Sequence, residues 1–383
     1  MNASHRRHAQ GAAASGRLFF VAPLLFAGLL AGLAACVPSA NAVATNTVAA
    51  NVAAASAAWV ASAAPGSQRI ALFDCASGDA RAAARLQQPL AAPLAYDPRT
   101  ASLYAATADA ELLRYALPGL ELRARVPLGF VARTLAVGTG PDALLLAGGD
   151  GQRALSAHDP ESLAPLERYT LAPASGVAAI LDVAGRGRFV VGFADAGQLW
   201  EIAYARDAPP VLRGLVHDYR MGEAVPLPGR LTPRPFRVDS ATRSLLAGPS
   251  SFEVLRIDTA GAVGVVNLDV RREIERPRLG AAADPLPAAS WRSENARGWL
   301  VAASDGSTQV LAAPDWRPTT REPDGAGAAI AAARERLRVS SSLARTHKGA
   351  ARVESAFDAG CAAAFDAQGR WLGSARLQPP RGP

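Results

Sequence analysis

Residues 176–202, GVAAILDVAGRGRFVVGFADAGQLWEI, contain the pattern that decides the fold. An apolar run ends in the glycine turn of residues 184–187, a second run follows at residues 188–192, and a third follows at residues 198–202. Short apolar runs separated by glycine or aspartate turns are typical of β-strands. The stretch therefore predicts a set of strands joined by tight turns.

Paired runs of this kind recur along the whole chain. They lie at residues 58–61 with 69–73, 102–106 with 111–115, 143–147 with 153–157, 188–192 with 198–202, 243–247 with 263–267, 298–302 with 307–311, and 336–340 with 361–365. Their starts are roughly 40 to 55 residues apart, which is the period of a four-stranded propeller blade. We therefore predict an all-β fold, a β-propeller of seven or eight four-stranded blades over residues 58–383.

Two segments depart from this period. Residues 211–237 read as an insertion between the fourth and fifth units, and residues 318–327 read as a loop. The alanine-rich residues 326–333 have helical propensity, but their register resembles that of residues 176–191, so we expect strands there. Long connections on a rigid repeat scaffold are common places for function.

The first segment is a secretory signal. Residues 1–35 contain no acidic residue, begin with a basic region and continue into a short apolar run that ends at Leu33-Ala34-Ala35-Cys36. This ending resembles the lipoprotein box of bacteria, which implies that Cys36 becomes the lipid anchor; an ordinary signal cleaved near Ala40 or Ala42 is the alternative. Residues 36–57 carry no charge and predict a flexible tether. The resemblance to bacterial lipoproteins also implies the periplasmic face of the outer membrane, since Val37 rather than aspartate follows the cysteine.

The composition excludes several partners and classes. The formal charge is +7 over 383 residues, but Lys348 is the only lysine and the arginines are scattered among acids. Scattered arginines do not form the basic stripe of a nucleic-acid surface, so we expect no nucleic-acid partner. No later run is long enough to span a bilayer, so we expect the membrane to be reached through the lipid alone.

The two cysteines beyond the anchor lie in the first and last units. Cys75 follows residues 69–74, and Cys361 begins the run of residues 361–365. In a closed propeller these units are neighbours, and an oxidising periplasm favours pairing. A Cys75–Cys361 disulfide is one expectation, and two unpaired thiols are the other.

Several motifs resemble the propeller of cytochrome cd1 nitrite reductase and its relatives in heme d1 biosynthesis. The stretches that carry the resemblance, over about residues 58–377, are residues 176–182, 198–202, 216–223, 231–234 and 265–269. The resemblance implies a heme d1 held by a proximal histidine under distal histidines. In this chain Pro277-Arg278-Leu279-Gly280 has arginine in place of histidine, and Ala92 and Arg234 fall where two further histidines are expected. No Cys-x-x-Cys-His motif is present, so there is no c-type heme.

Candidate ligand-binding residues remain around the insertion. His158 and His347 are expected to be surface residues, whereas His217 lies near Arg220 and precedes Arg234. These side chains, with Arg278, could bind an anion through their guanidinium groups, or they could form a solvated loop. One histidine with acids does not make a three-ligand zinc site, so we expect no metal.

Nucleophile-elbow, phosphate-loop and dinucleotide motifs are absent from the sequence. We therefore expect a non-catalytic binding or accessory protein, with no cofactor, near respiratory nitrogen-oxide or heme d1 metabolism. Its partner would be a protein or a small anionic ligand. The alternative is a tetrapyrrole-binding oxidoreductase or heme d1 biosynthesis enzyme.

Overall fold

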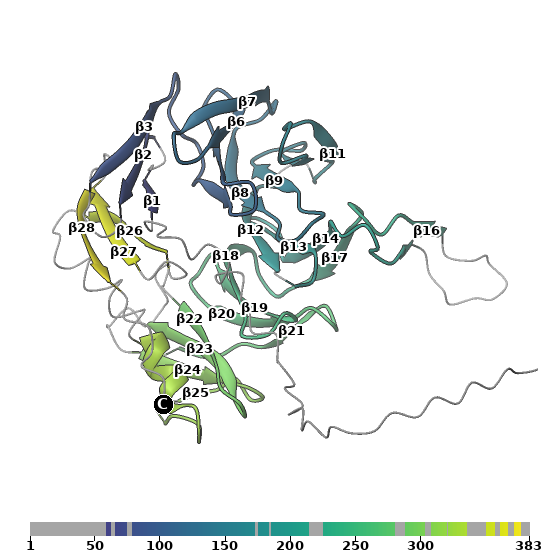
Figure 1. The fold of residues 1–383 in the computed structure, drawn as a ribbon. Coiled ribbons are helices and arrows are strands. Elements are labelled where there is room, and N and C mark those ends of the chain that lie inside the picture. Colours follow the sequence, from purple (N-terminus) through teal and green to yellow (C-terminus); the bar gives the residue numbers. More distant parts are fainter. Residues whose placement is uncertain are drawn as a thin grey trace, which may run out of the picture. The chain divides into compact units, whose positions relative to one another are not determined.

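Seven antiparallel sheets follow one another along the described chain and form the blades of a β-propeller (Figure 1). The computed structural model describes residues 59–62, 66–74, 79–172, 175–183, 185–213, 225–279, 288–302, 308–319, 321–334, 350–356, 361–366 and 371–376. Within these residues the second to sixth sheets have four strands, and the first and last have three. The predicted β-propeller is confirmed, and the described residues form seven of its sheets.

The strands of the first four blades have the following bounds: β1 (Trp59–Ser62), β2 (Arg69–Asp74), β3 (Ala80–Arg85); β4 (Ala95–Asp97), β5 (Ser102–Ala106), β6 (Glu111–Ala116), β7 (Glu121–Pro127); β8 (Ala132–Val137), β9 (Leu145–Gly149), β10 (Leu155–His158), β11 (Pro165–Tyr169); β12 (Val177–Val183), β13 (Arg188–Phe193), β14 (Gln198–Ala203), β17 (Pro233–Arg237). Those of the last three blades are β18 (Thr242–Ala247), β19 (Glu253–Asp258), β20 (Val263–Asn267), β21 (Arg272–Glu275); β22 (Ala288–Arg292), β23 (Arg297–Ala302), β24 (Thr308–Ala312), β25 (Pro318–Thr319); β26 (Ala350–Ala356), β27 (Cys361–Asp366), β28 (Trp371–Arg376).

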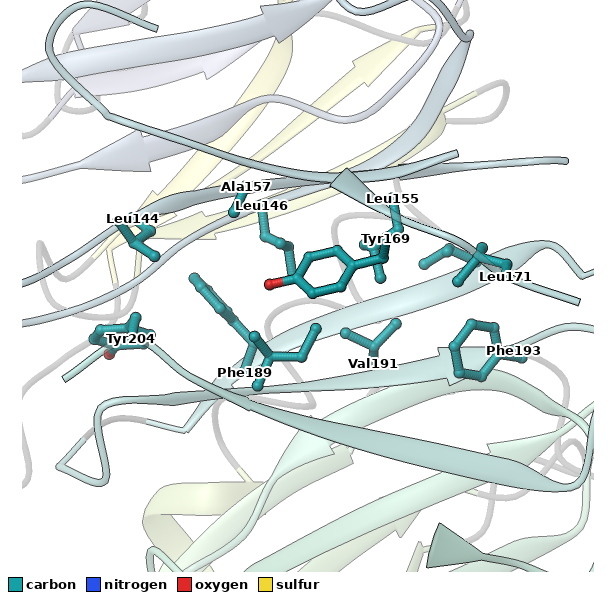
Figure 2. Packing of buried hydrophobic residues seen from close by; sticks show 12 residues of the cluster. Leu144, Leu146, Leu155, Ala157, Tyr169, Leu171, Phe189, Val191, Phe193 and Tyr204 are labelled. Carbon is teal, nitrogen blue, oxygen red and sulfur yellow. The ribbon is translucent and has the colours of Figure 1, made fainter. Parts of the chain in front are cut away.

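Apolar cores lie between consecutive blades from the first to the sixth, and each of the second to fifth sheets contributes one face to each neighbour. In β9, Leu146 packs toward the fourth blade while Leu145 packs toward the second. Figure 2 shows the core between the third and fourth blades, where Phe189 and Val191 of β13 face Leu146. Because successive residues of a strand point to opposite faces, a strand between two cores must be apolar at every position. This explains the uninterrupted apolar runs of the sequence.

The first and last blades are neighbours. Strand β1 contacts β26, so the ring of sheets closes between the purple and yellow blades (Figure 1). Strands β2 and β27 are the middle strands of these two sheets. Asp74 ends β2 and Cys361 begins β27. Cys75 and the side chain of Cys361 lie outside the described residues, and the disulfide stays a prediction.

The insertion lies inside the fourth blade, which corrects the predicted position between the fourth and fifth units. Strand β17, at the end of the expected insertion, pairs with β14 and is the outer strand of that blade. The true excursion contains a separate hairpin of β15 (Val211–Arg213) and β16 (Val225–Leu227). In the fifth blade the predicted pair of runs matches β18 and β20, and the prediction missed β19 between them.

Residues 327–334 form a helix, which corrects the expected strand. Ala326, Ile330 and Ala333 are buried against Leu300 and Val310 of the sixth blade. Their spacing of four and three residues places them on one helical face, and alanine is the best helix former. Likewise Pro318 and Thr319 form the outer strand of that sheet rather than a loop.

The helix predicts a specific pattern of stability effects. Ile330→Ala should lower the free energy of unfolding by about 2–5 kcal/mol, because a buried side chain is removed. Ala328→Asp should change it by less than about 0.5 kcal/mol, because residue 328 is exposed on the helix. In a strand, residues 328 and 330 would share a face and both changes would be costly. Urea denaturation of the two variants distinguishes these outcomes.

Candidate anion-binding site

An open pocket of ≈ 780 Å³ lies on the fifth blade. One wall is the turn between β19 and β20, residues 260–263, and the other is the segment after β21, residues 275–279. Arg278, predicted from the sequence as a ligand-binding residue, lines this pocket. Leu279, Val263 and the alanines of the turn give the pocket apolar surface beside the guanidinium groups.

The turn that forms one wall is held by Asp258. Its Oδ1 accepts hydrogen bonds from the backbone N–H groups of Ala260 at 2.9 Å and Ala262 at 2.8 Å. Gly261 between them has a φ of 83°, a left-handed conformation that glycine adopts without strain. Burial opposes ionisation, but hydrogen bonds from Ser240 and the turn amides and the charge of Arg256 keep the pKa of Asp258 below its ordinary value. The wall is therefore fixed before any ligand arrives.

The two arginines of the pocket differ in their partners. Arg276 is tied to the protein, since its guanidinium contacts Asp258 Oδ2 at 3.1 Å and Glu273 Oε1 at 3.2 Å. Arg278 is exposed and makes no hydrogen bond or ion pair to a described residue. A guanidinium has five N–H donors in a planar fork that matches carboxylate and phosphate oxygens. Arg278 is thus the group in this pocket that is free to bind an anion.

A second arginine cluster contains Arg234. Its Nη2 donates hydrogen bonds to the carbonyl oxygens of Pro209 at 2.6 Å and Pro210 at 3.2 Å, which braces the base of the β15–β16 hairpin. Arg234 lies opposite Glu201 in the β14–β17 ladder. Glu201 also pairs with Arg271, which lies in the turn after β20. The Arg278 pocket is lined instead by the turn before β20. The structure therefore places Arg234 and Arg278 at opposite ends of a five-residue strand, about 17 Å long, and does not bring them together.

His158 is buried, which corrects its expected surface position. Only 1 % of the residue is exposed, because His158 ends strand β10 in the interior of the blade. Its Nδ1 lies 3.0 Å from the carbonyl oxygen of Leu163, and its Nε2 lies 2.8 Å from Ser156 Oγ. A carbonyl oxygen only accepts, so Nδ1 carries the hydrogen and Nε2 accepts from the hydroxyl. His158 is a structural side chain in its neutral form.

Asp182, from the stretch that carries the family resemblance, joins two blades. Its carboxylate accepts hydrogen bonds from the hydroxyl of Tyr204 at 2.7 Å and from the backbone N–H of Thr139 at 3.0 Å. Burial raises the pKa of Asp182, and burial also raises the pKa of Tyr204 to about 12. The group stabilises the junction of the third and fourth blades.

The remaining predicted site residues lie outside the described part of the chain. These are the lipid-anchor residue Cys36 and the insertion residues His217 and Arg220. His347 lies outside it as well. Asp258 and Glu201, which organise the two arginine clusters, were missed by the sequence analysis. No local spacing identifies Glu201, because its partner Arg271 is 70 residues away in the sequence, whereas Asp258 binds the amides of its own turn.

The described innermost strands do not fit a heme iron. As far as the structure describes β1, β4, β8, β12, β18, β22 and β26, they contain no histidine, cysteine or methionine, which are common axial ligands. Tyr96 on β4 is the one phenol among these strands. Burial and the neighbouring Asp97 raise its pKa, which opposes the phenolate that iron would bind. Among the described residues there is also no group of three or more histidine, cysteine or acidic side chains that could hold a metal ion.

These observations define the protein as a β-propeller with an arginine pocket on one blade. No protein family and no curated protein matches the sequence. Among solved structures, dihydro-heme d1 dehydrogenase NirN in complex with DHE is similar, with a TM-score of 0.56 at 18 % identity. That match covers 84 % of this chain and 64 % of the NirN chain, slightly under two thirds.

Two further propellers are similar to the chain. BamB from Moraxella catarrhalis has a TM-score of 0.48 at 12 % identity, covering 84 % of this chain and 83 % of that one. The Dos1 propeller has a TM-score of 0.49 at 12 % identity, covering 79 % and 72 %. The likeness to NirN supports the β-propeller fold. Within the described residues, no helix is long and apolar enough to cross a bilayer.

The burial of His158 predicts a pH dependence of stability. Burial lowers the pKa of His158 below its ordinary value of 6.5, so the unfolded chain binds the proton more tightly than the folded one. The free energy of unfolding should therefore fall as the pH drops below about 6.5, by at most about 1.4 kcal/mol per pH unit. The variant His158→Gln should lack this contribution. Urea denaturation at pH 7.5, 6.5 and 5.5 measures the difference, in which other titrating groups cancel; parallel pH profiles would contradict the prediction.

Proposed function

We propose that the protein is a lipid-anchored, non-catalytic binding or accessory propeller of the d1-like class. It would act at the periplasmic face of the outer membrane, in respiratory nitrogen-oxide or heme d1 metabolism. The observation that carries the proposal is the guanidinium of Arg278 in the pocket of the fifth blade, which has no partner among the described residues. The resemblance places a histidine at this position, and an always-charged arginine binds anions but does not ligate iron.

The surroundings of Arg278 favour binding of a small anion. Most acids near the pocket are already paired: Glu273 with Arg256 at 2.7 Å, and Asp258 with Arg276 at 3.1 Å. Glu275 lines the pocket too, and because Arg276 is already paired, Arg278 is the arginine of the pocket whose charge balances it. An incoming carboxylate or phosphate would therefore meet a free guanidinium beside apolar side chains. Such pockets combine apolar lining with a few placed polar groups.

The pocket is tested by thermal unfolding in the presence of inorganic phosphate or succinate. We expect saturating anion to stabilise the wild-type chain, by about 2.7 kcal/mol at one hundred times the dissociation constant. Arg278→Gln should weaken this binding at least about fivefold, because it removes the charged donor fork. Arg272→Gln is the matched control, since Arg272 is exposed, carries the same charge and lies outside the pocket.

Absorbance spectra of the chain mixed with heme distinguish the proposed function from the alternative. A non-catalytic protein without an iron ligand should leave the Soret band of free heme unchanged. A Soret shift that His217→Ala removes would instead support the tetrapyrrole-binding oxidoreductase or heme d1 biosynthesis enzyme. Equal anion binding by the wild type and Arg278→Gln would disprove the assignment of the pocket.

The lipid anchor is tested by fractionation. Cys36→Ser should abolish lipidation and leave a soluble or uncleaved precursor, because stable anchoring takes more than one acyl chain and the variant carries none. Immunoblots of soluble and outer-membrane fractions measure this. If Cys36→Ser remains in the outer-membrane fraction with normal processing, the lipid anchor is wrong.

A further inference from the structure

Three arginines from separate strands and turns surround one buried carboxylate at the junction of the fourth and fifth blades. Glu201 on β14 is 1 % exposed. Arg271 of the fifth blade places its Nε 2.8 Å from Glu201 Oε2, and Arg188 on β13 places its Nη1 3.6 Å from Oε1. Arg234 lies opposite Glu201 in the β14–β17 ladder. We call Arg188, Glu201, Arg234 and Arg271 the junction cluster.

The junction cluster has more positive charge than its own carboxylate neutralises. Burial and the charges of Arg188 and Arg271 lower the pKa of Arg234, and Glu201 offsets this only in part. Each arginine also keeps free donors, because Arg271 uses only Nε and Arg188 only Nη1 toward described residues. An additional anion would therefore find both uncompensated charge and unused N–H groups.

Two exposed apolar side chains, one on the fifth blade and one on the β15–β16 hairpin, lie next to residues that belong to or contact the junction cluster. Val270, next to Arg271, is 59 % exposed. Leu212 on β15 is 65 % exposed and lies two residues beyond Pro210, whose carbonyl oxygen accepts from Arg234 at 3.2 Å. Exposed apolar side chains combined with arginine are characteristic of protein interfaces. The surface formed by the junction cluster, Val270 and Leu212 is named the junction surface.

We propose that the junction surface docks an acidic segment of a partner protein. A carboxylate of that segment binds the free donors of Arg188 and Arg271, and neighbouring apolar side chains cover Val270 and Leu212. The side chain of Arg188 is only 16 % exposed, so the cluster is a recessed, directional site rather than the open cationic surface that a bilayer attracts.

This surface goes beyond the proposed function and does not depend on the Arg278 pocket. The two sites use turns at opposite ends of β20, and no residue belongs to both. A variant of one site should therefore leave the other intact, so failure of either proposal is recognisable.

The test measures fluorescence anisotropy of the labelled peptide Glu-Leu-Glu-Glu-Leu-Glu with the full mature chain. We expect binding that weakens with added salt and that Arg271→Gln and Leu212→Ser each weaken at least about fivefold. The matched controls Arg272→Gln and Arg278→Gln should change the affinity less than about twofold. Leu212 is so exposed that its replacement does not threaten folding, which keeps the test valid if Arg271→Gln is unstable.

Several results would overturn the proposal. They are an absence of binding, equal binding of the neutral analogue with glutamine for glutamate, and unchanged affinity in folded Arg271→Gln or Leu212→Ser protein. Binding to vesicles of phosphatidylglycerol that Arg271→Gln abolishes, without binding to the peptide, would assign the surface to a membrane instead.

Discussion

The structure depends on the requirement that both faces of each sheet be covered. A strand whose neighbouring residues, such as Leu145 and Leu146, belong to two different cores cannot leave either face in water. Each blade therefore needs a neighbour on both sides, and a linear stack would expose its two end sheets. Closure of β1 against β26 removes this exposure. In the sixth blade the short helix at residues 327–334 covers the face opposite the fifth-blade core, which shows that coverage matters more than the element that supplies it.

Because the cores are apolar, buried charged groups must be paired, as Arg256 is with Glu273. Glu253 of the fifth blade accepts hydrogen bonds from the guanidinium of Arg297 of the sixth at 3.0–3.2 Å. The carboxylate of Asp97 likewise forms an ion pair with Arg99, whose Nη2 lies 2.9 Å from Oδ2. Leaving either acid buried and unpaired would be strongly unfavourable. Exposed arginines such as Arg272 also have no partner among the described residues, so a free donor alone does not mark a site. Arg278 differs because it lines a pocket, and the junction cluster differs because its arginines face a buried carboxylate.

The repeat was predictable because it is local. Residues 188–192 and 198–202 reveal their strands by composition, and β13 and β14 are where the runs place them. The helix was missed because the resemblance of residues 327–330 to residues 176–180 was given more weight than alanine propensity. His158 was misplaced because burial depends on Ser156 and Leu163 folding around it. Arg278 was chosen from a resemblance. Its turn-fixing neighbour Asp258 binds amides only two and four residues further on, a local aspartate turn that the sequence analysis did not use.

The segment that carries the β15–β16 hairpin leaves the fourth blade after Ala203 and rejoins it at Leu231, and these two residues are neighbours in space. Leu231 donates its N–H to the carbonyl oxygen of Ala203 at 2.7 Å, so the two ends of the excursion are joined by a hydrogen bond. The entropy of closing such a loop grows only with the logarithm of its length. The stability of the blades therefore depends only weakly on the length of the excursion, so its sequence can change while the packing of the blades stays the same. A scaffold of this kind can acquire a new recognition element by exchanging one loop, without redesigning any core.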